Sequence, residues 1–116
     1  MTRPLSRGDN VLVRCPFTDL SGDNVRPAVV ASWRIGPDVV LAFTTSRSAV
    51  PDPQTDVLIP VSHPGFSRSG LKVTSIVRLN KRATLDRSLL TRRSGTLDST
   101  LISDIDNTLR SVLGLW

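Results

Sequence analysis

The sequence lacks several residue types that common classes of site require. It has one cysteine, Cys15, and one histidine, His63, among 116 residues. A single cysteine excludes an intrachain disulfide, and one cysteine with one histidine cannot supply the ligands of a typical structural zinc site. Glutamate is absent, so any catalytic carboxylate must come from the ten aspartates. We therefore expect no bound metal and no cofactor.

Long apolar runs are also missing. No stretch approaches the ~20 apolar residues that a membrane span needs, and the first five residues lack the apolar core of a signal peptide. We expect a cytoplasmic protein with no membrane contact. The length is typical of one folding unit, so we expect residues 1–116 to form a single domain.

Positive charge is in excess. The chain has 15 Lys and Arg against 10 acidic residues, which gives a net charge of +5 and a pI near 11.0. Such a balance favours a polyanionic partner. Thirteen of the cations are arginine, whose planar guanidinium suits bidentate contact with phosphate, although GC-rich codon usage produces the same bias.

Short apolar runs between turn residues predict a β-rich fold. We expect strands at residues 11–15, 26–33, 39–45 and 56–60, and at 71–73 and 75–79 as two strands or one interrupted strand. Pro27 fits near a strand start, where a missing donor is tolerated. Residues 46–54 and 63–70 are rich in turn residues and are expected to be loops. So many strands in a short chain imply a strongly bent sheet or a small barrel.

The C-terminal segment has a helical period instead. Its apolar residues recur at Leu101, Ile105, Leu109 and Val112. Asp98 or Ser99 can cap the first turn of this helix, and Gly114 can end the last. The sequence therefore predicts a mainly β fold with a C-terminal α-helix.

Six segments follow one another in the order and spacing of a known family. They are residues 7–13 (RGDNVLV), 16–22 (PFTDLSG), 25–30 (VRPAVV), 43–46 (FTTS), 76–86 (IVRLNKRATLD) and 97–115. Together they resemble the MazF/PemK-like toxin family over nearly the whole chain. The resemblance implies a small SH3-like β-barrel with a terminal helix, a homodimer, and a sequence-selective endoribonuclease. It also implies two partners, single-stranded RNA and a cognate antitoxin with an acidic tail, and contact with DNA only through the antitoxin complex.

RNA cleavage without a metal sets three chemical tasks. The neighbouring 2′-hydroxyl can act as nucleophile, so groups must accept its proton, protonate the leaving 5′-oxygen and stabilise the negative charge on the phosphate. Arg26 and Arg78 match basic positions of the family, although each could be a solvated charge at a strand end or the partner of an aspartate. Thr44 stands where the family places its active-site hydroxyl, although a strand-end threonine can also bond its own backbone. We predict Arg26, Thr44 and Arg78 as the catalytic residues.

The groups that move protons are less evident. Some family members place an acid two residues after the Val-Arg arginine and a histidine in the first long loop. Here Asn80 stands at the first position, and residues 21–24 contain no histidine. Asp19 and Asp23 are candidate substitutes, although aspartate is also a common turn residue. His63 lies in a Ser-His-Pro-Gly segment and is expected to be an exposed loop residue.

Further residues are predicted to contact the substrate. They are Asp19, Thr45, Ser46, Arg47, Asn80, Lys81 and Arg82. Arg47, Lys81 and Arg82 could form a phosphate track together with Arg68, and Phe17 or Trp33 could stack a base, although most of the five aromatic residues are expected in the core. The acidic tail of an antitoxin is predicted to lie across Arg26 and Arg78 and to become ordered there.

Asn80 also motivates a different class of protein. A chain that lacks its proton-transfer residues could be an SH3-like module that binds RNA or a peptide without cleavage. A third interpretation is a structural barrel whose positive charge only keeps it soluble. Cleavage of RNA in the presence of EDTA separates the enzyme from both alternatives.

Overall fold

The computed structural model describes residues 4–15, 25–32, 36–46 and 50–115. Six strands make up most of it: β1 (Asp9–Arg14), β2 (Val25–Val30), β3 (Asp38–Thr45), β4 (Asp56–Ile59), β5 (Ser75–Asp86) and β6 (Leu90–Thr96). Two α-helices, α1 (Phe66–Ser69) and α2 (Ser99–Leu113), and the 3-10 helix η1 (Arg87–Leu89) complete the elements. No helix in the described ranges is long and apolar enough to cross a membrane.

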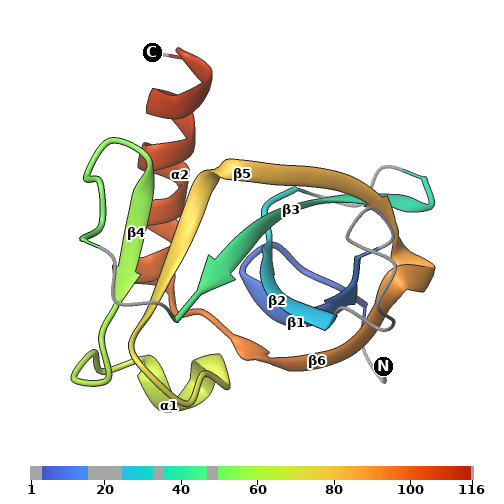
Figure 1. Cartoon of the computed structure of the whole chain (residues 1–116), viewed down its shortest axis with the longest axis horizontal. Coiled ribbons are helices and arrows are strands. Elements are labelled where there is room, and N and C mark those ends of the chain that lie inside the picture. The colour runs from blue at the N-terminus through green and yellow to red at the C-terminus, as the bar shows by residue number, and fades with distance from the viewer. Residues whose placement is uncertain (1–3, 16–24, 33–35, 47–49, 116) are drawn as a thin grey trace.

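The strands form one antiparallel sheet in the order β4-β5-β3-β2-β1-β6. The sheet curls so that β1, β2, β3, β5 and β6 surround a common interior, while β4 and α2 stand to one side (Figure 1). Strands β4 and β6 are its two edges and do not pair with each other. The predicted mainly β fold with a C-terminal helix is confirmed, but the sheet is strongly bent and open, so the term barrel applies only loosely.

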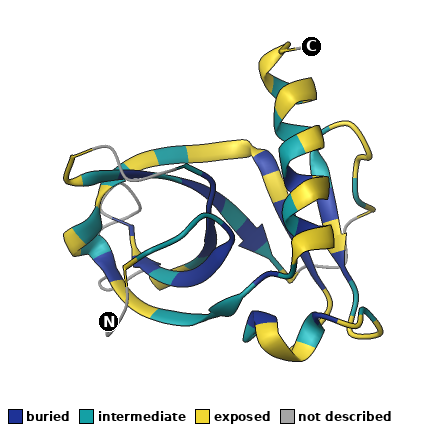
Figure 2. Cartoon of the chain, turned by 180° about the vertical axis from the view of Figure 1, so that it is seen from behind, coloured by how far each residue is buried: buried dark blue, intermediate teal, exposed yellow. Residues whose placement is uncertain are grey.

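A core cluster lies on each face of the sheet. Alternate residues of β2 show this, because Ala28 and Val30 belong to a core cluster within the curl, whereas Val29 belongs to a second cluster on the opposite face. Leu101 and Ile105 of α2 are the buried residues of that helix and pack into the second cluster. Figure 2 shows that the buried residues gather in the inner strands of the curl, whereas the outer side of α2 and much of β5 are exposed. The helix therefore covers one face of the sheet and leaves the ends of β2 and β3 uncovered.

Helix α2 begins and ends as the sequence predicts. The side chain of Asp98 accepts a hydrogen bond from the backbone N–H of Leu101 at 2.9 Å. Gly114 ends the helix with a positive φ of 71°, a conformation that glycine adopts without a steric cost.

Several predicted boundaries are wrong. Residues 71–73 form no strand: they follow the turn at Gly70, Leu71 packs against the core, and Lys72 and Val73 are exposed. The expected loop at 63–70 contains the one-turn helix α1, and the expected strand at 26–33 spans Val25–Val30. Strand β6 was not expected, because its sequence LTRRSGT has no apolar run; it pairs along β1 with two irregularities in register.

Candidate active site

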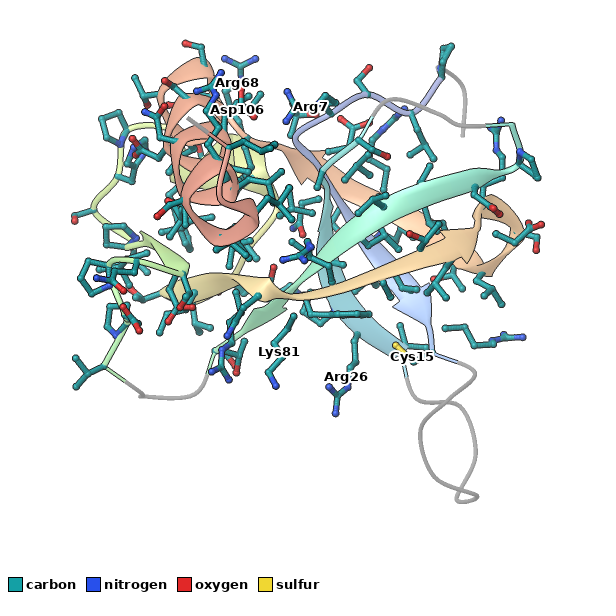
Figure 3. The ribbon with its side chains drawn as sticks, turned by 90° about the horizontal axis from the view of Figure 1, so that it is seen from above. Arg7, Cys15, Arg26, Arg68, Lys81 and Asp106 are labelled. Carbon is teal, nitrogen blue, oxygen red and sulfur yellow. The ribbon has the colours of Figure 1, made fainter. Side chains whose placement is uncertain are left out.

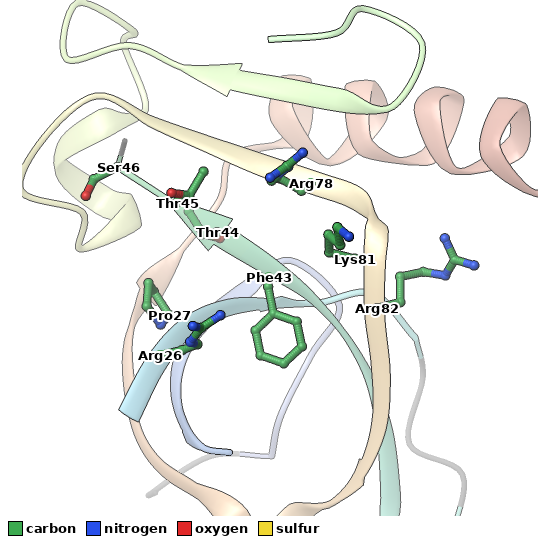
Figure 4. A pocket seen from close by; sticks show the side chains of 9 residues that line it. All are labelled: Arg26, Pro27, Phe43, Thr44, Thr45, Ser46, Arg78, Lys81 and Arg82. Carbon is green, nitrogen blue, oxygen red and sulfur yellow. The ribbon is translucent and has the colours of Figure 1, made fainter. Parts of the chain in front are cut away.

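A cavity of about 600 Å³ opens where β2, β3 and β5 meet (Figure 4). Its lining comes from these three strands and the residue that follows β3. The lining residues are Arg26, Pro27, Phe43, Thr44, Thr45, Ser46, Arg78, Lys81 and Arg82. All three residues predicted to be catalytic are therefore in one cavity, together with four of those predicted to bind substrate.

Strand pairing explains how Arg26, Thr44 and Arg78 come together. Pairing between β2 and β3 begins at Ala28 and Phe43, so Arg26 and Thr44 lie just beyond the last pair on adjacent strands. On the other side of β3, Arg78 is the direct partner of Phe43. Residues more than fifty positions apart in the chain thus line one cavity through backbone register alone.

The cavity is strongly cationic. Arg26, Arg78, Lys81 and Arg82 line it, whereas none of its described lining residues is acidic. Just outside the lining, Oδ1 of Asp56 on β4 lies 4.0 Å from Nε of Arg78. A surface of this kind attracts the phosphates of a nucleic acid, and guanidinium groups fit phosphate oxygens.

The hydroxyl of Thr44 is enclosed and lacks a partner. Thr44 is 9% exposed, and its Oγ1 makes no hydrogen bond within the described part of the chain. Such a group is destabilising unless something satisfies it. Thr44 also lines a second hollow of about 300 Å³, which shares Pro27 and Ser46 with the main cavity. Thr44 is therefore shared by the two hollows.

A bulge in β5 determines which side chains reach the cavity. The register passes from Phe43 opposite Arg78 to Ala42 opposite Arg82, so residues 79–81 have no partners on β3. Asn80 is exposed and does not line the cavity, whereas Lys81 and Arg82 do. Asn80, which stands where some family members have an acid, is thus outside the lining, and its predicted contact with substrate stays a prediction.

Other predicted residues lie elsewhere. Asp19, Asp23, Arg47, Phe17 and Trp33 fall outside the described residues. Arg68 of α1 is on the opposite side of the molecule from Arg26 and Lys81 (Figure 3), so it is not part of the same phosphate track.

His63 is also outside the cavity. Its Nδ1 accepts a hydrogen bond from the backbone N–H of Gly65 at 2.9 Å and lies 3.8 Å from Oδ2 of Asp98. His63 thus fixes the turn before α1, as expected of a loop residue, although it is only partly exposed.

Phe43 and Pro27 line the cavity but were not among the predicted site residues. The ring of Phe43 lies between Arg26 and Lys81 in the cavity (Figure 4) and offers a flat apolar surface. Its position directly before Thr44 in the FTTS segment was the available signal.

Cys15 lies near this site but is a poor nucleophile. Burial raises the pKa of its thiol above the usual value, and the positive charge of Arg26 opposes that shift only in part. The described residues contain no group of three or more His, Cys and acidic side chains that could hold a metal ion.

Comparisons with known proteins place the chain in a family. A sequence profile described as "PemK-like, MazF-like toxin of type II toxin-antitoxin system" matches residues 6–113. No curated protein sequence is a significant match. The profile covers almost the whole sequence, and the chain belongs to this family of toxins.

Solved structures of similar fold agree with that assignment. A mycobacterial endoribonuclease in complex with its cognate antitoxin is 24% identical, with 98% of each chain covered and a TM-score of 0.72. A mycobacterial endoribonuclease is 26% identical over 100% of this chain and 97% of that one, with a TM-score of 0.69. MazF from Deinococcus radiodurans is 22% identical over 95% and 96% of the two chains, with a TM-score of 0.71.

Proposed function

We propose that this chain is the toxin of a type II toxin–antitoxin system and that it cleaves single-stranded RNA, including mRNA, in the cavity between β2, β3 and β5. Such cleavage would inhibit translation and growth. The observation that carries the proposal is the convergence of Arg26, Thr44 and Arg78 on one cavity whose described lining has four cations and no carboxylate. Membership of the toxin family and the likeness to solved endoribonucleases support it.

The proposed reaction uses the RNA's own 2′-hydroxyl. Its oxygen attacks the neighbouring phosphorus, the bond from phosphorus to the 5′-oxygen breaks, and the products carry a 2′,3′-cyclic phosphate and a 5′-hydroxyl. Arg26 and Arg78 bind the non-bridging oxygens and stabilise the added negative charge. Thr44 donates its otherwise unpartnered hydroxyl to the same phosphate. DNA, which has no 2′-hydroxyl, is not cleaved.

RNA cleavage with analysis of the product ends tests this function. Purified protein and a long RNA are incubated with and without EDTA, beside Arg26→Ala and the control Arg110→Ala, an exposed residue of α2 outside the cavity. We expect cuts at discrete sites that resist EDTA, end in 2′,3′-cyclic phosphate and slow by about 10²–10³-fold only in Arg26→Ala. An intact RNA, or cutting that EDTA abolishes, would contradict the proposal.

The proposed inhibitor is the acidic tail of a cognate antitoxin. A flexible, negatively charged segment complements the cavity and would exclude RNA by covering Arg26 and Arg78. Binding of the antitoxin to wild-type protein and to the Arg26→Ala/Arg78→Ala double variant checks the placement. Equal affinities for the two proteins would show that the tail lies elsewhere.

We also infer a cytoplasmic homodimer that reaches DNA only through its antitoxin. Light scattering of the purified toxin measures its mass, and a monomer at micromolar concentration would contradict the dimer. A binding module without catalysis is not favoured, because it was motivated by Asn80, which does not line the cavity.

A further inference from the structure

Lys81 reaches the cavity because of the bulge in β5. Residues 79–81 have no partners on β3, and within this stretch the side chain of Leu79 is fully buried. The backbone N–H of Leu79 donates instead to the carbonyl oxygen of Thr55 at 2.8 Å. With Leu79 turned into the core, the backbone brings Lys81 beside Arg78 in the lining and leaves Asn80 outside it.

Arg82 is held differently from Lys81. Its Nη1 donates a hydrogen bond to the carbonyl oxygen of Leu79 within the same bulge. Figure 4 shows the guanidinium of Arg82 pointing away from Phe43, whereas Lys81 lies between Phe43 and Arg78. Lys81 and Arg78 therefore line the same part of the cavity, whereas the guanidinium of Arg82 is directed away from Phe43.

Among the described lining residues, Lys81 alone combines a mobile positive charge with a proton that it can give up. Arginine guanidinium groups are not deprotonated in proteins, so Arg26, Arg78 and Arg82 cannot exchange a proton with substrate. Proline and phenylalanine have no such proton, and the hydroxyls of the threonines and Ser46 are neutral and much weaker acids than an ammonium. A bond from phosphorus to an alkoxide breaks more easily when the departing oxygen receives a proton.

We propose that Lys81 is the general acid of this RNA cleavage; the proposal rests on the function proposed above. The 2′-oxygen forms a bond to phosphorus while its proton passes to a solvent water molecule. The bond from phosphorus to the 5′-oxygen breaks, and that oxygen takes a proton from the ammonium of Lys81. Lysine is left as the neutral amine and recovers its proton from solvent, so the reaction has no net change in oxidation state or proton count.

A substrate with a sulfur leaving group tests this role. The cut site is first located in a long RNA, and two short oligomers are then made, one natural and one with sulfur in place of the bridging 5′-oxygen. A thiolate leaves without a proton, so only the natural oligomer requires a general acid. The proteins compared are wild type, Lys81→Ala, Lys81→Arg and the control Lys72→Ala, which changes the other lysine of the chain, outside the main cavity.

We expect both Lys81 variants to cleave the natural oligomer about 10²–10⁴-fold more slowly than wild type and to cleave the sulfur oligomer at nearly the wild-type rate. Lys81→Arg is decisive, because it keeps the positive charge and removes the transferable proton. Lys72→Ala should leave the ratio of the two rates as in wild type. Equal slowing of both oligomers by the Lys81 variants, or full activity of Lys81→Arg, would overturn the role of Lys81. Wild-type protein that leaves the long RNA uncut would overturn the proposed function itself.

Discussion

Nε of Arg78 lies 4.0 Å from Oδ1 of Asp56, its direct partner across the β4–β5 pair. Two hydrogen bonds from residues before β4 hold the Asp56 carboxylate in place. Its Oδ2 accepts the backbone N–H of Asp52 at 2.9 Å, and its Oδ1 accepts the hydroxyl of Thr55 at 3.1 Å. The side chain of Asp56 is only 7% exposed, whereas that of Arg78 is 45% exposed. Asp56 is therefore placed to orient Arg78 at the edge of the cavity.

Asp56→Asn should lower the turnover of RNA without weakening RNA binding. The pair is partly exposed, so losing it is worth at most about 1 kcal/mol, or about a fivefold fall in kcat. Removing a negative charge beside a cationic cavity should leave RNA affinity unchanged or increase it. Single-turnover cleavage and filter binding measure the two effects, with Asp52→Asn as the control. A kcat equal to that of wild type would mean that Asp56 does not position Arg78.

Thr44→Val should separate stability from activity. Valine has nearly the shape of threonine and removes the enclosed hydroxyl that has no partner in the described structure, so the melting temperature should stay the same or rise. Cleavage should fall about 10²-fold if that hydroxyl binds the phosphate. Thermal unfolding and cleavage assays measure both, with Thr84→Val, an exposed position of β5 outside the cavity, as the control. A clear loss of stability in Thr44→Val would indicate a structural hydrogen bond, and unchanged cleavage would remove Thr44 from the mechanism.

Local sequence signals identified the elements that hold Arg26 and Thr44. The β-branched runs around both residues predicted β2 and β3, and the period of Leu101 and Ile105 predicted α2 with its cap at Asp98. These signals depend on short-range alternation and capping, which a sequence displays directly. The meeting of Arg78 with Arg26 could be anticipated only from the family motifs, because strand order is set by contacts between distant parts of the chain.

The bulge in β5 could not be predicted. The segment IVRLNKRATLD contains no glycine or proline to mark an irregularity, and its alternation alone would place Asn80 on the same face as Arg78. The bulge is fixed by the burial of Leu79 and by the hydrogen bond from its backbone N–H to the carbonyl oxygen of Thr55, just before β4. Both are contacts between distant parts of the chain, which the local sequence does not display. Strand β6 was not predicted for a related reason. Its polar sequence has a low β-propensity, and its pairing with β1 stabilises the strand.

Arg82→Ala should weaken RNA binding and reduce its dependence on salt. Each phosphate contact to single-stranded nucleic acid contributes about 0.7 to the slope of log affinity against log salt concentration. Loss of one contact should therefore lower the slope by about 0.7, whatever the RNA sequence. Affinity measured across a range of salt concentrations checks this, with Arg110→Ala of α2 as the control. A slope equal to that of wild type would mean that Arg82, held by the carbonyl of Leu79, makes no phosphate contact.

The cap of α2 should make stability fall in acid. The pKa of Asp98 is held below its ordinary value mainly by the N–H of Leu101, and further by the hydroxyl of Thr100 at 2.7 Å. Because that pKa is lower in the folded than in the unfolded chain, the cap stabilises fully above about pH 4 and is lost as the pH falls through the folded value. Asp98→Asn should cap α2 without this titration, so its stability should fall less than that of wild type between pH 5 and pH 2 in urea unfolding. Asp98→Ala should lower the free energy of unfolding by about 1 kcal/mol at pH 7.

Asp104→Asn, on the exposed side of α2, is the matched control. If Asp98→Asn and wild type showed the same loss in acid, the carboxylate of Asp98 would not be the group responsible.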